Sequence, residues 1–135
     1  MVGFPRMDAE ELGKVSLFSD LSDDDVRALA TYADEVTVSE GKHLVDEGGY
    51  AYDLFVIVEG TAQVLVGGEV VAELGTGDFF GEAGVIEKTE RNATVIAKTR
   101  MRLVTLTGWD LRRMRRQLGP VWDKLEQAIK ERAHN

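Results

Sequence analysis

The residues best suited to chemistry in this sequence lie between Gly77 and Val95, in the run GDFFGEAGVIEKTERNATV. This run opens on a glycine-rich corner, carries the carboxylate of Glu82, and reaches Arg91 nine positions later. The guanidinium of an arginine is a planar fork of donors that matches a phosphate group, and a carboxylate accepts hydrogen bonds from hydroxyl groups. A carboxylate and an arginine at opposite ends of one loop therefore predict a pocket for a ligand with a phosphate and free hydroxyls.

The backbone of the same loop offers a second set of donors. Its most apolar part, Ala83 to Ile86, follows the Gly81-Glu82 corner and fits a single helical turn. Free N–H groups at the start of a helix bind anions, because they have no partner within the helix. Two interpretations stay open on this basis. The loop is either a phosphate-ester pocket or a segment held by a plain salt bridge between Glu82 and Arg91, which would contribute little to stability.

The sequence around this loop predicts short strands, with helices before and after them. Apolar runs of strand length recur through the middle of the chain, and two of them flank Gly67-Gly68, which is a strong hairpin signal. Helices first and last, with roughly eight short strands between them, indicate an α+β fold and not the βαβ alternation of a parallel sheet. The clearest strands are expected at 36–38, 54–58, 62–66, 69–74, 94–97 and 101–106.

The first helices are expected before residue 35. A short helix is predicted over 8–15 from its composition. Ser22 is a candidate N-cap, and the three aspartates at 23–25 suit the positive end of a helix dipole. Apolar residues at helical spacing then predict a helix that ends near Asp34.

Two further helices are expected after the last strand. Thr107 can cap a helix over 108–117, and Gly119-Pro120 predicts a break and a fresh start. The second helix carries an apolar stripe, which either packs on its own domain or forms a dimer seam. The stripe consists of Val121, Leu125, Ala128 and Ile129.

The composition excludes several classes of protein. The 135 residues include no cysteine, which excludes a disulfide framework, thiol chemistry and a Cys-ligated metal. The two histidines, His43 and His134, are too few for a multi-histidine centre, so we expect no metal site, no cofactor and no enzyme. No apolar run reaches about 18 residues, and the N-terminus does not resemble a signal peptide. We therefore expect a cytoplasmic protein without a membrane-inserted segment.

The charge of the chain is unevenly distributed. The formal net charge is −8, and residues 1–107 carry nine Lys or Arg against twenty Asp or Glu, whereas residues 108–135 carry seven against four. An acidic chain argues against nucleic acid as a partner, because phosphate contacts need Lys and Arg. We expect the basic C-terminal part to pack electrostatically on its own acidic body.

The loop and its surroundings resemble the cyclic nucleotide-binding domain family. Phe80-Gly81-Glu82, followed by Arg91-Asn92-Ala93-Thr94-Val95, is similar to the phosphate-binding cassette of that family, including a Glu-to-Arg spacing that the family uses. The resemblance covers about residues 15–118. Outside the cassette it rests on Leu17-Phe18, Leu21-Ser22, Glu47-Gly48, Phe55–Gly60 and Gly75–Gly81.

The resemblance implies a fold. It is an eight-stranded antiparallel β-roll of jelly-roll type, flanked by N-terminal and C-terminal helices. The whole of residues 1–135 would form one domain, with N-terminal helices at about 8–34, the roll at about 36–107 and the C-terminal helices at about 108–132.

The resemblance also implies roles for single residues. Arg91 would pair with the exocyclic oxygens of a cyclic phosphate, and Glu82 would accept a hydrogen bond from the ribose 2′-hydroxyl. The other expected ligand-binding residues are the backbone at Gly81, Ala83, Gly84, Asn92 and Ala93 and the apolar walls Val64, Val71 and Leu74. The Asn92 side chain can both donate and accept, so the base preference stays open, with cyclic AMP favoured and cyclic GMP as the alternative.

The implied function is a cyclic nucleotide sensor whose C-terminal helices close over the base and change position on binding. Candidates for this lid are Trp109, Trp122, Arg112, Arg113, Arg115 and Arg116, which otherwise serve as packing anchors and solvent-facing charges. The downstream protein or domain that would read the signal is unknown, and a homodimer is an open alternative.

Three other functions are alternatives to a cyclic nucleotide sensor. A domain of the same fold could regulate through protein contacts without a ligand. A jelly-roll metal enzyme would need clustered histidines and carboxylates, which the sequence lacks. A transcription regulator would need a DNA-binding domain, yet only 16 residues follow Gly119. The chain is then either a stand-alone sensor or a regulatory fragment of a larger protein.

Overall fold

A computed structural model describes residues 9–46, 53–80 and 93–133 of the chain. The helices are α1 (Ala9–Gly13), the 3₁₀ turn η1 (Ser16–Phe18), α2 (Asp23–Ala30), α4 (Gly108–Gln117) and α5 (Gly119–Ala133). The strands are β1 (Asp34–Val38), β2 (His43–Val45), β3 (Leu54–Glu59), β4 (Ala62–Val66), β5 (Glu69–Leu74), β6 (Phe79–Phe80), β7 (Thr94–Ala97) and β8 (Met101–Leu106).

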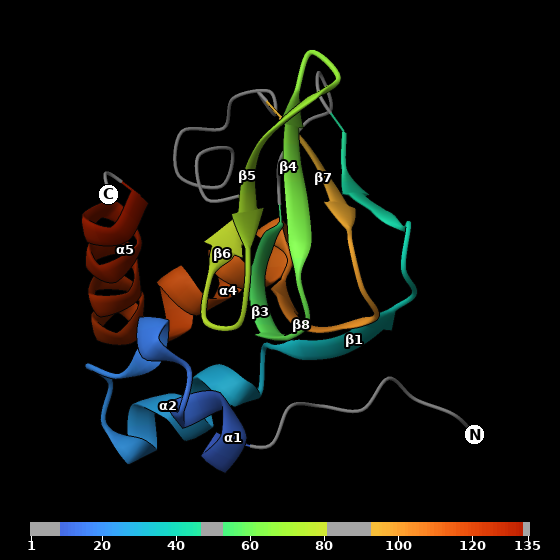
Figure 1. The fold of residues 1–135 in the computed structure, drawn as a ribbon. Coiled ribbons are helices and arrows are strands. Elements are labelled where there is room, and N and C mark those ends of the chain that lie inside the picture. Colours follow the sequence, from blue (N-terminus) through green and yellow to red (C-terminus); the bar gives the residue numbers. More distant parts are fainter. Residues whose placement is uncertain (1–8, 47–52, 81–92, 134–135) are drawn as a thin grey trace.

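The strands form a roll of two antiparallel sheets, with the helices gathered beside it (Figure 1). One sheet has the order β1-β8-β3-β6 and the other the order β2-β7-β4-β5. Consecutive strands pair across the Gly67-Gly68 turn, where both glycines have positive φ, as the hairpin signal predicts. The predicted α+β class and the eight-stranded roll with flanking helices are both confirmed.

The helix caps follow the sequence prediction, but the end of α2 does not. The Ser22 side chain accepts a hydrogen bond from the Asp25 N–H at 3.1 Å, as expected of an N-cap. The helix ends at Ala30 and does not reach Asp34. Asp34 instead pairs with Thr105 in the β1–β8 ladder, so strand pairing takes residues that the apolar spacing assigned to the helix.

The helices and one face of the roll share a single apolar core. We call α1, η1, α2, α4 and α5 together the helical layer. Phe18 and Leu29 from its N-terminal part lie in one buried cluster with Trp122 and Ile129 of α5 and with Val104 of β8. The stripe Val121, Leu125, Ala128 and Ile129 is at most 5% exposed, which confirms that it packs on its own domain.

An ion-pair cluster fastens α1 to the roll. The guanidinium of Arg102 on β8 donates from Nε to Glu35 of β1 at 2.7 Å, and a terminal nitrogen lies 2.9 Å from a carboxylate oxygen of Glu11 on α1. The other terminal nitrogen of Arg102 lies 3.4 Å from a carboxylate oxygen of Glu59 at the end of β3. The hydrogen bond to Glu35 contributes most to raising the pKa of Arg102, which keeps the guanidinium charged.

Gly60, directly after β3, is expected to tolerate no side chain. Its φ is +104°, and a Cβ there would lie 2.6 Å from the Arg100 carbonyl oxygen and 2.8 Å from Cγ of Met101. Left-handed backbone alone costs a residue with a Cβ about 1–2 kcal/mol, and this clash adds to that cost. Gly60→Ala should therefore lower the free energy of unfolding by about 3 kcal/mol in urea titrations.

Gly68→Ala is the matched control for this substitution. Gly68 also has a positive φ, +83°, but a Cβ there would meet no atom within 4 Å. Gly68→Ala should therefore lower the free energy of unfolding only by the cost of the left-handed backbone, about 1 kcal/mol. Equal losses in the two variants would show that the close approach of Arg100 and Met101 to Gly60 has no energetic weight.

Candidate ligand-binding site

The candidate binding loop is anchored in both sheets of the roll. Phe80, at the end of β6, is buried and pairs with Phe55 of the first sheet, and the two rings stack at 5.0 Å between centroids. The next described strand, β7, begins at Thr94 opposite Leu65 in the second sheet. The sequence between these anchors, which carries the predicted cassette, therefore joins the two sheets.

Most of the predicted cassette lies outside the described residues. This applies to Gly81, Glu82, Ala83, Gly84, Arg91 and Asn92, and to the helical turn expected over 83–86. Their roles toward a ligand stay predictions.

The structure describes four of the predicted site residues, and two of them, Val64 and Ala93, lie near each other. Val64 on β4 and Leu74 on β5 are half-buried and pack against the core of the roll. Val64 pairs with Val95 of β7, and Ala93 precedes Val95 by two residues, which is about 7 Å along a strand. The inner side of the second sheet thus places Val64 near the end of the cassette, whereas Leu74 pairs with Ala62, whose partner in β7 is Ala97, well beyond Ala93.

Val71, the fourth of these residues, lies apart from the others. The register between β4 and β5 shifts by one residue beside it, and Val71 has no partner in the ladder. Its side chain is 59% exposed. An extra residue of this kind is a β-bulge, which bends the strand and redirects side chains. A contact between Val71 and a ligand stays a prediction.

The pair formed by Phe55 and Phe80 was not predicted as part of the site. The ring planes are 11° apart, and Phe80 is only 6% exposed at the point where the chain leaves the first sheet. The sequence signal was the Phe79-Phe80 pair directly before the cassette. A two-residue strand is too short to show any periodicity, so the pattern did not reveal it.

The C-terminal helices separate the two tryptophans that were candidates for a lid. Trp122 is 3% exposed in the core of the helical layer, with the guanidinium of Arg115 4.9 Å from its ring centre. It therefore serves as a packing anchor, the alternative that the sequence had left open. Trp109, near the start of α4, is 63% exposed and is free to meet a ligand or a partner.

Polar contacts tie the C-terminal helices to the N-terminal ones. The Tyr32 hydroxyl donates to the side chain of Gln117 at the end of α4, and Arg113 lies 5.2 Å from the Tyr32 ring centre. Lys124 of α5 donates to the Asp25 carboxylate of α2 at 3.1 Å. The α4–α5 pair is therefore held to the N-terminal helices by side chains as well as by the shared core.

The contact between Lys124 and Asp25 predicts a pH dependence. The hydrogen bond from Lys124 is the largest cause of a lowered pKa at Asp25, against an ordinary value of 3.8. A carboxyl with a lowered folded-state pKa stabilises the fold above its unfolded pKa, and this contribution is lost as the pH falls through the folded value. Asp25→Asn should therefore be less stable than the wild type at neutral pH and no less stable at pH values well below 3.8.

Urea unfolding at both pH values measures this effect, with Asp123→Asn as the control. Asp123 is exposed on α5 and makes no ion pair within the described part of the chain. Its replacement should change stability little at either pH. A deficit of Asp25→Asn that persists unchanged in acid would contradict the role of the ionised carboxylate.

The described residues offer no metal site and no membrane-spanning helix. Among them, no three His, Asp or Glu side chains are grouped closely enough to hold a metal ion. Within the same part of the chain, no helix is both long and apolar enough to cross a bilayer.

The architecture defines a ligand-binding β-roll domain, with two antiparallel sheets joined by a cassette sequence and helices packed on one face. Residues 35–117 match the model of the family described as "Cyclic nucleotide-binding domain". The chain belongs to this family. Its curated relatives include regulatory subunits of cAMP-dependent protein kinases.

Individual relatives are consistent with this assignment. The chain is 40% identical over 119 residues to the cAMP-dependent protein kinase regulatory subunit of Yarrowia lipolytica, covering 86% of this chain and 31% of that protein. It spans about a quarter to a third (23–31%) of the curated relatives that it matches.

Two solved structures of the same fold differ in their ligand behaviour. The regulatory domain of Toxoplasma gondii protein kinase A, solved with cAMP, superposes with a TM-score of 0.73 at 22% identity, covering 91% of this chain and 48% of that one. The regulatory subunit of a cAMP-independent protein kinase A from Trypanosoma brucei has a TM-score of 0.76 at 25% identity, covering 90% and 45%. The fold therefore serves both kinds of protein.

Proposed function

We propose that this chain is a sensor module that binds a cyclic nucleotide, with cyclic AMP as the preferred ligand. The observation that carries the proposal is the FGE…RNATV cassette sequence, which lies between the anchored ends of β6 and β7. The half-buried side chain of Val64 beside the end of this cassette supports an apolar wall for the ligand, to which Leu74 on the neighbouring strand β5 would contribute.

The proposed chemistry divides the ligand between charged and apolar groups. Arg91 pairs with the exocyclic oxygens of the cyclic phosphate, because its planar fork can donate two parallel hydrogen bonds. Glu82 accepts a hydrogen bond from the free 2′-hydroxyl of the ribose. Backbone N–H groups complete the anion cradle, and they come from Ala83, Gly84, Asn92 and Ala93 next to the turn at Gly81.

The proposed response to the ligand is a shift of the C-terminal helices. A ligand can shift an equilibrium between two arrangements only by binding one of them more tightly. The helical layer supports a coupled movement, because α5 shares its core with η1 and α2. A displacement of α5 would have to carry these N-terminal helices along or break the contacts of Trp122 and Lys124.

Isothermal titration with cyclic AMP and cyclic GMP tests the proposal. The chain must first be freed of nucleotide carried over from expression, because bound ligand would mask the site. Saturable binding with a preference for cyclic AMP is expected. Preference for cyclic GMP would correct the choice of base, with Asn92 as the first residue to replace.

The second candidate is a regulatory domain that acts through protein contacts without a nucleotide. The similarity to the regulatory subunit of a cAMP-independent kinase favours keeping it. It predicts no heat and no thermal shift with either nucleotide. In both versions the 135-residue chain acts as one non-catalytic cytoplasmic module that signals to another protein or domain, either alone or as part of a longer protein.

A further inference from the structure

The outward face of α4 carries a row of residues that we call the arginine stripe. It consists of Trp109, Arg112, Arg113 and Arg116. These positions follow the spacing i, i+3, i+4 and i+7, which places them on one side of a helix. The buried residues of α4, Leu111 and Met114, lie on the opposite side. Trp109 therefore faces away from the core, at the N-terminal end of a row of arginines.

Two of these arginines have no counter-charge among the described residues. Arg113 has Asp110 at 3.6 Å, and the neighbouring Arg115 has Glu126 at 3.9 Å. Arg112 and Arg116 are exposed and make no ion pair within the described part of the chain, and the Arg112 guanidinium lies 5.7 Å from the centre of the Trp109 ring. Like charges four residues apart on a helix destabilise it slightly, so intrahelical contacts give no reason for this pair.

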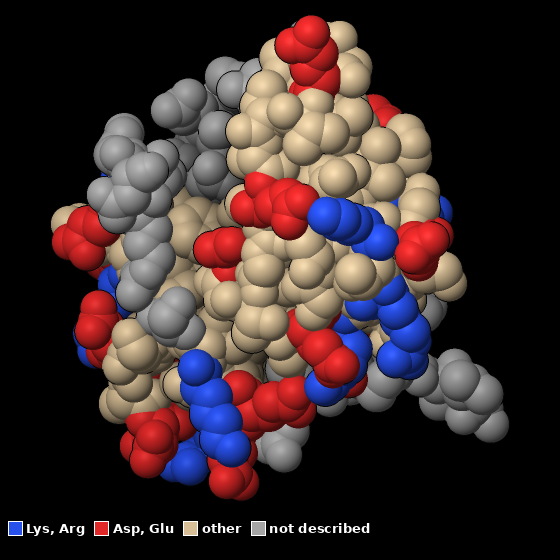
Figure 2. Space-filling model, in the orientation of Figure 1, with Lys and Arg blue, Asp and Glu red and all other residues tan. Residues whose placement is uncertain are grey.

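The charges elsewhere on the molecule are arranged differently. Figure 2 shows acidic and basic side chains next to one another over the helical part of its face, and a larger uncharged area over the strands with a few acidic and basic side chains near its middle. Ion pairs such as Asp24–Arg27 on α2 and Glu73–Lys98 on the second sheet bring opposite charges together elsewhere on the molecule. On a chain of net charge −8, Arg112 and Arg116 form a local excess of positive charge without such partners among the described residues.

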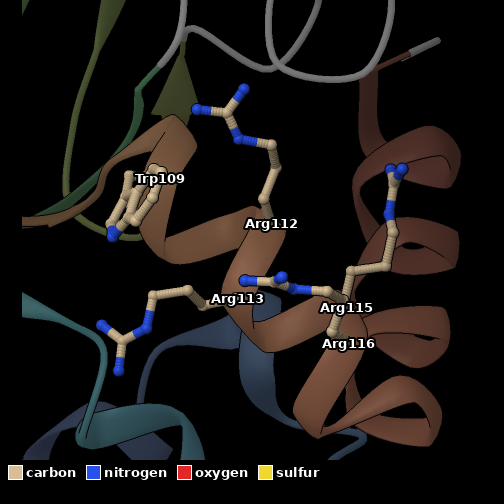
Figure 3. Close-up of a pocket in the computed structure, with 5 residues that line it drawn as sticks. All are labelled: Trp109, Arg112, Arg113, Arg115 and Arg116. Carbon is tan, nitrogen blue, oxygen red and sulfur yellow. The ribbon is translucent and has the colours of Figure 1, made fainter.

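The stripe also borders a hollow. Trp109 and the four arginines of α4 line a space of about 360 Å³ (Figure 3). Figure 3 shows the guanidinium groups spreading in different directions from α4, with Arg112 beside Trp109 and Arg113 on the opposite side. The aliphatic parts of the arginine side chains thus line the hollow with apolar surface, and the guanidinium groups lie around its edge. Tryptophan and arginine are the residues that most often dominate the binding energy of protein–protein contacts.

We propose that the arginine stripe docks an acidic segment of a partner protein, with an apolar side chain of that segment in the hollow against Trp109. Carboxylates match the guanidinium fork and would neutralise Arg112 and Arg116. The overall negative charge of the chain disfavours a nucleic acid, whose continuous phosphate backbone needs a wide basic surface.

Fluorescence anisotropy with labelled probes tests this proposal on the full chain. The probes are a peptide that alternates Asp and Glu with Leu, the same peptide with Asn and Gln in place of the acids, and oligothymidine of equal charge. The acidic peptide should bind, weaken as salt is raised, and outbind both other probes. Lack of binding, equal binding of the neutral peptide or tighter binding of oligothymidine would each overturn the proposal.

The double variant Arg112→Glu/Arg116→Glu should weaken peptide binding by about tenfold or more. Its matched control is Lys42→Glu/Arg100→Glu, which changes the net charge equally at exposed positions of the roll that also make no ion pair within the described residues. The control should keep most of the affinity for the peptide. Equal losses of affinity in the two double variants would show that net charge, and not the arginine stripe, determines binding. Arg112→Gln/Arg116→Gln serves if the reversed charges disturb α4, with thermal unfolding as the check of folding.

Trp109→Ala isolates the apolar part of the contact. It should weaken peptide binding severalfold without changing the salt dependence, because it removes the indole ring that contacts the apolar side chain of the peptide and leaves the charges in place. Sedimentation of the wild-type chain tests whether a second copy of the chain occupies the stripe. Self-association that Arg112→Glu/Arg116→Glu abolishes would assign the stripe to a second copy and overturn the choice of a different partner.

Discussion

Arg91→Ala is expected to weaken cyclic AMP binding by at least about a hundredfold, from saturable heat in a titration to little or none. A hydrogen bond to a charged group contributes roughly 1.5–3 kcal/mol, and two parallel bonds to one phosphate are lost together. About 2.7 kcal/mol corresponds to a factor of one hundred in the dissociation constant. The measurement is isothermal titration on nucleotide-free protein, with thermal unfolding as a check that the variant is folded.

Two further variants make this result specific to the geometry of the arginine. Arg91→Lys keeps the positive charge but loses the planar fork, so it should fall between the wild type and Arg91→Ala. Arg100→Ala removes an exposed arginine in the turn between β7 and β8 and should bind like the wild type. Unchanged binding in Arg91→Ala would show that the arginine does not contact the phosphate. It would favour the other interpretation, in which Arg91 and Glu82 form a structural salt bridge.

Trp122→Ala is expected to lower the free energy of unfolding by about 3–5 kcal/mol, the range for truncating a buried aromatic residue. Trp122 is 3% exposed and lies in the cluster that holds α5 against η1, α2 and the first sheet. Its removal leaves a cavity where all these elements meet. Urea unfolding followed by circular dichroism measures the loss, since fluorescence would lose one of only two tryptophans.

Trp109→Ala is the control for that prediction, because it removes the same side chain from a neighbouring helix. Trp109 is 63% exposed, so its loss should change stability by no more than about 0.5 kcal/mol. Similar losses in the two variants would mean that the helical layer does not depend on Trp122 as its centre.

The sequence predicted those parts of the fold that depend on local chemistry. The caps at Ser22 and Thr107 and the turn at Gly67-Gly68 each follow from a side chain or a backbone angle within a few residues. The strands β2 and β6 were not predicted individually, because two or three residues cannot show an alternation. Strand pairing, and not local propensity, fixed the end of α2.

Contacts between distant residues could not be predicted in this way. Arg102 meets Glu11, Glu35 and Glu59, and no spacing in the sequence connects the four positions. The same applies to the stacking of Phe55 on Phe80 beneath the cassette. For the site itself, the resemblance to the family pointed to Val64, Val71 and Leu74, and the bulge that exposes Val71 has no signature in the sequence.

The shared core of the helical layer has a consequence for how the chain is made. Phe18 and Leu29 emerge from the ribosome well before their partners Trp122 and Ile129. The first strand likewise waits for the eighth, since β1 pairs with β8. Contacts so far apart in sequence slow folding, because the loop between them must close first. The nascent N-terminal helices therefore stay without their core until α5 has been translated, and until then their apolar side chains are exposed to chaperones and proteases.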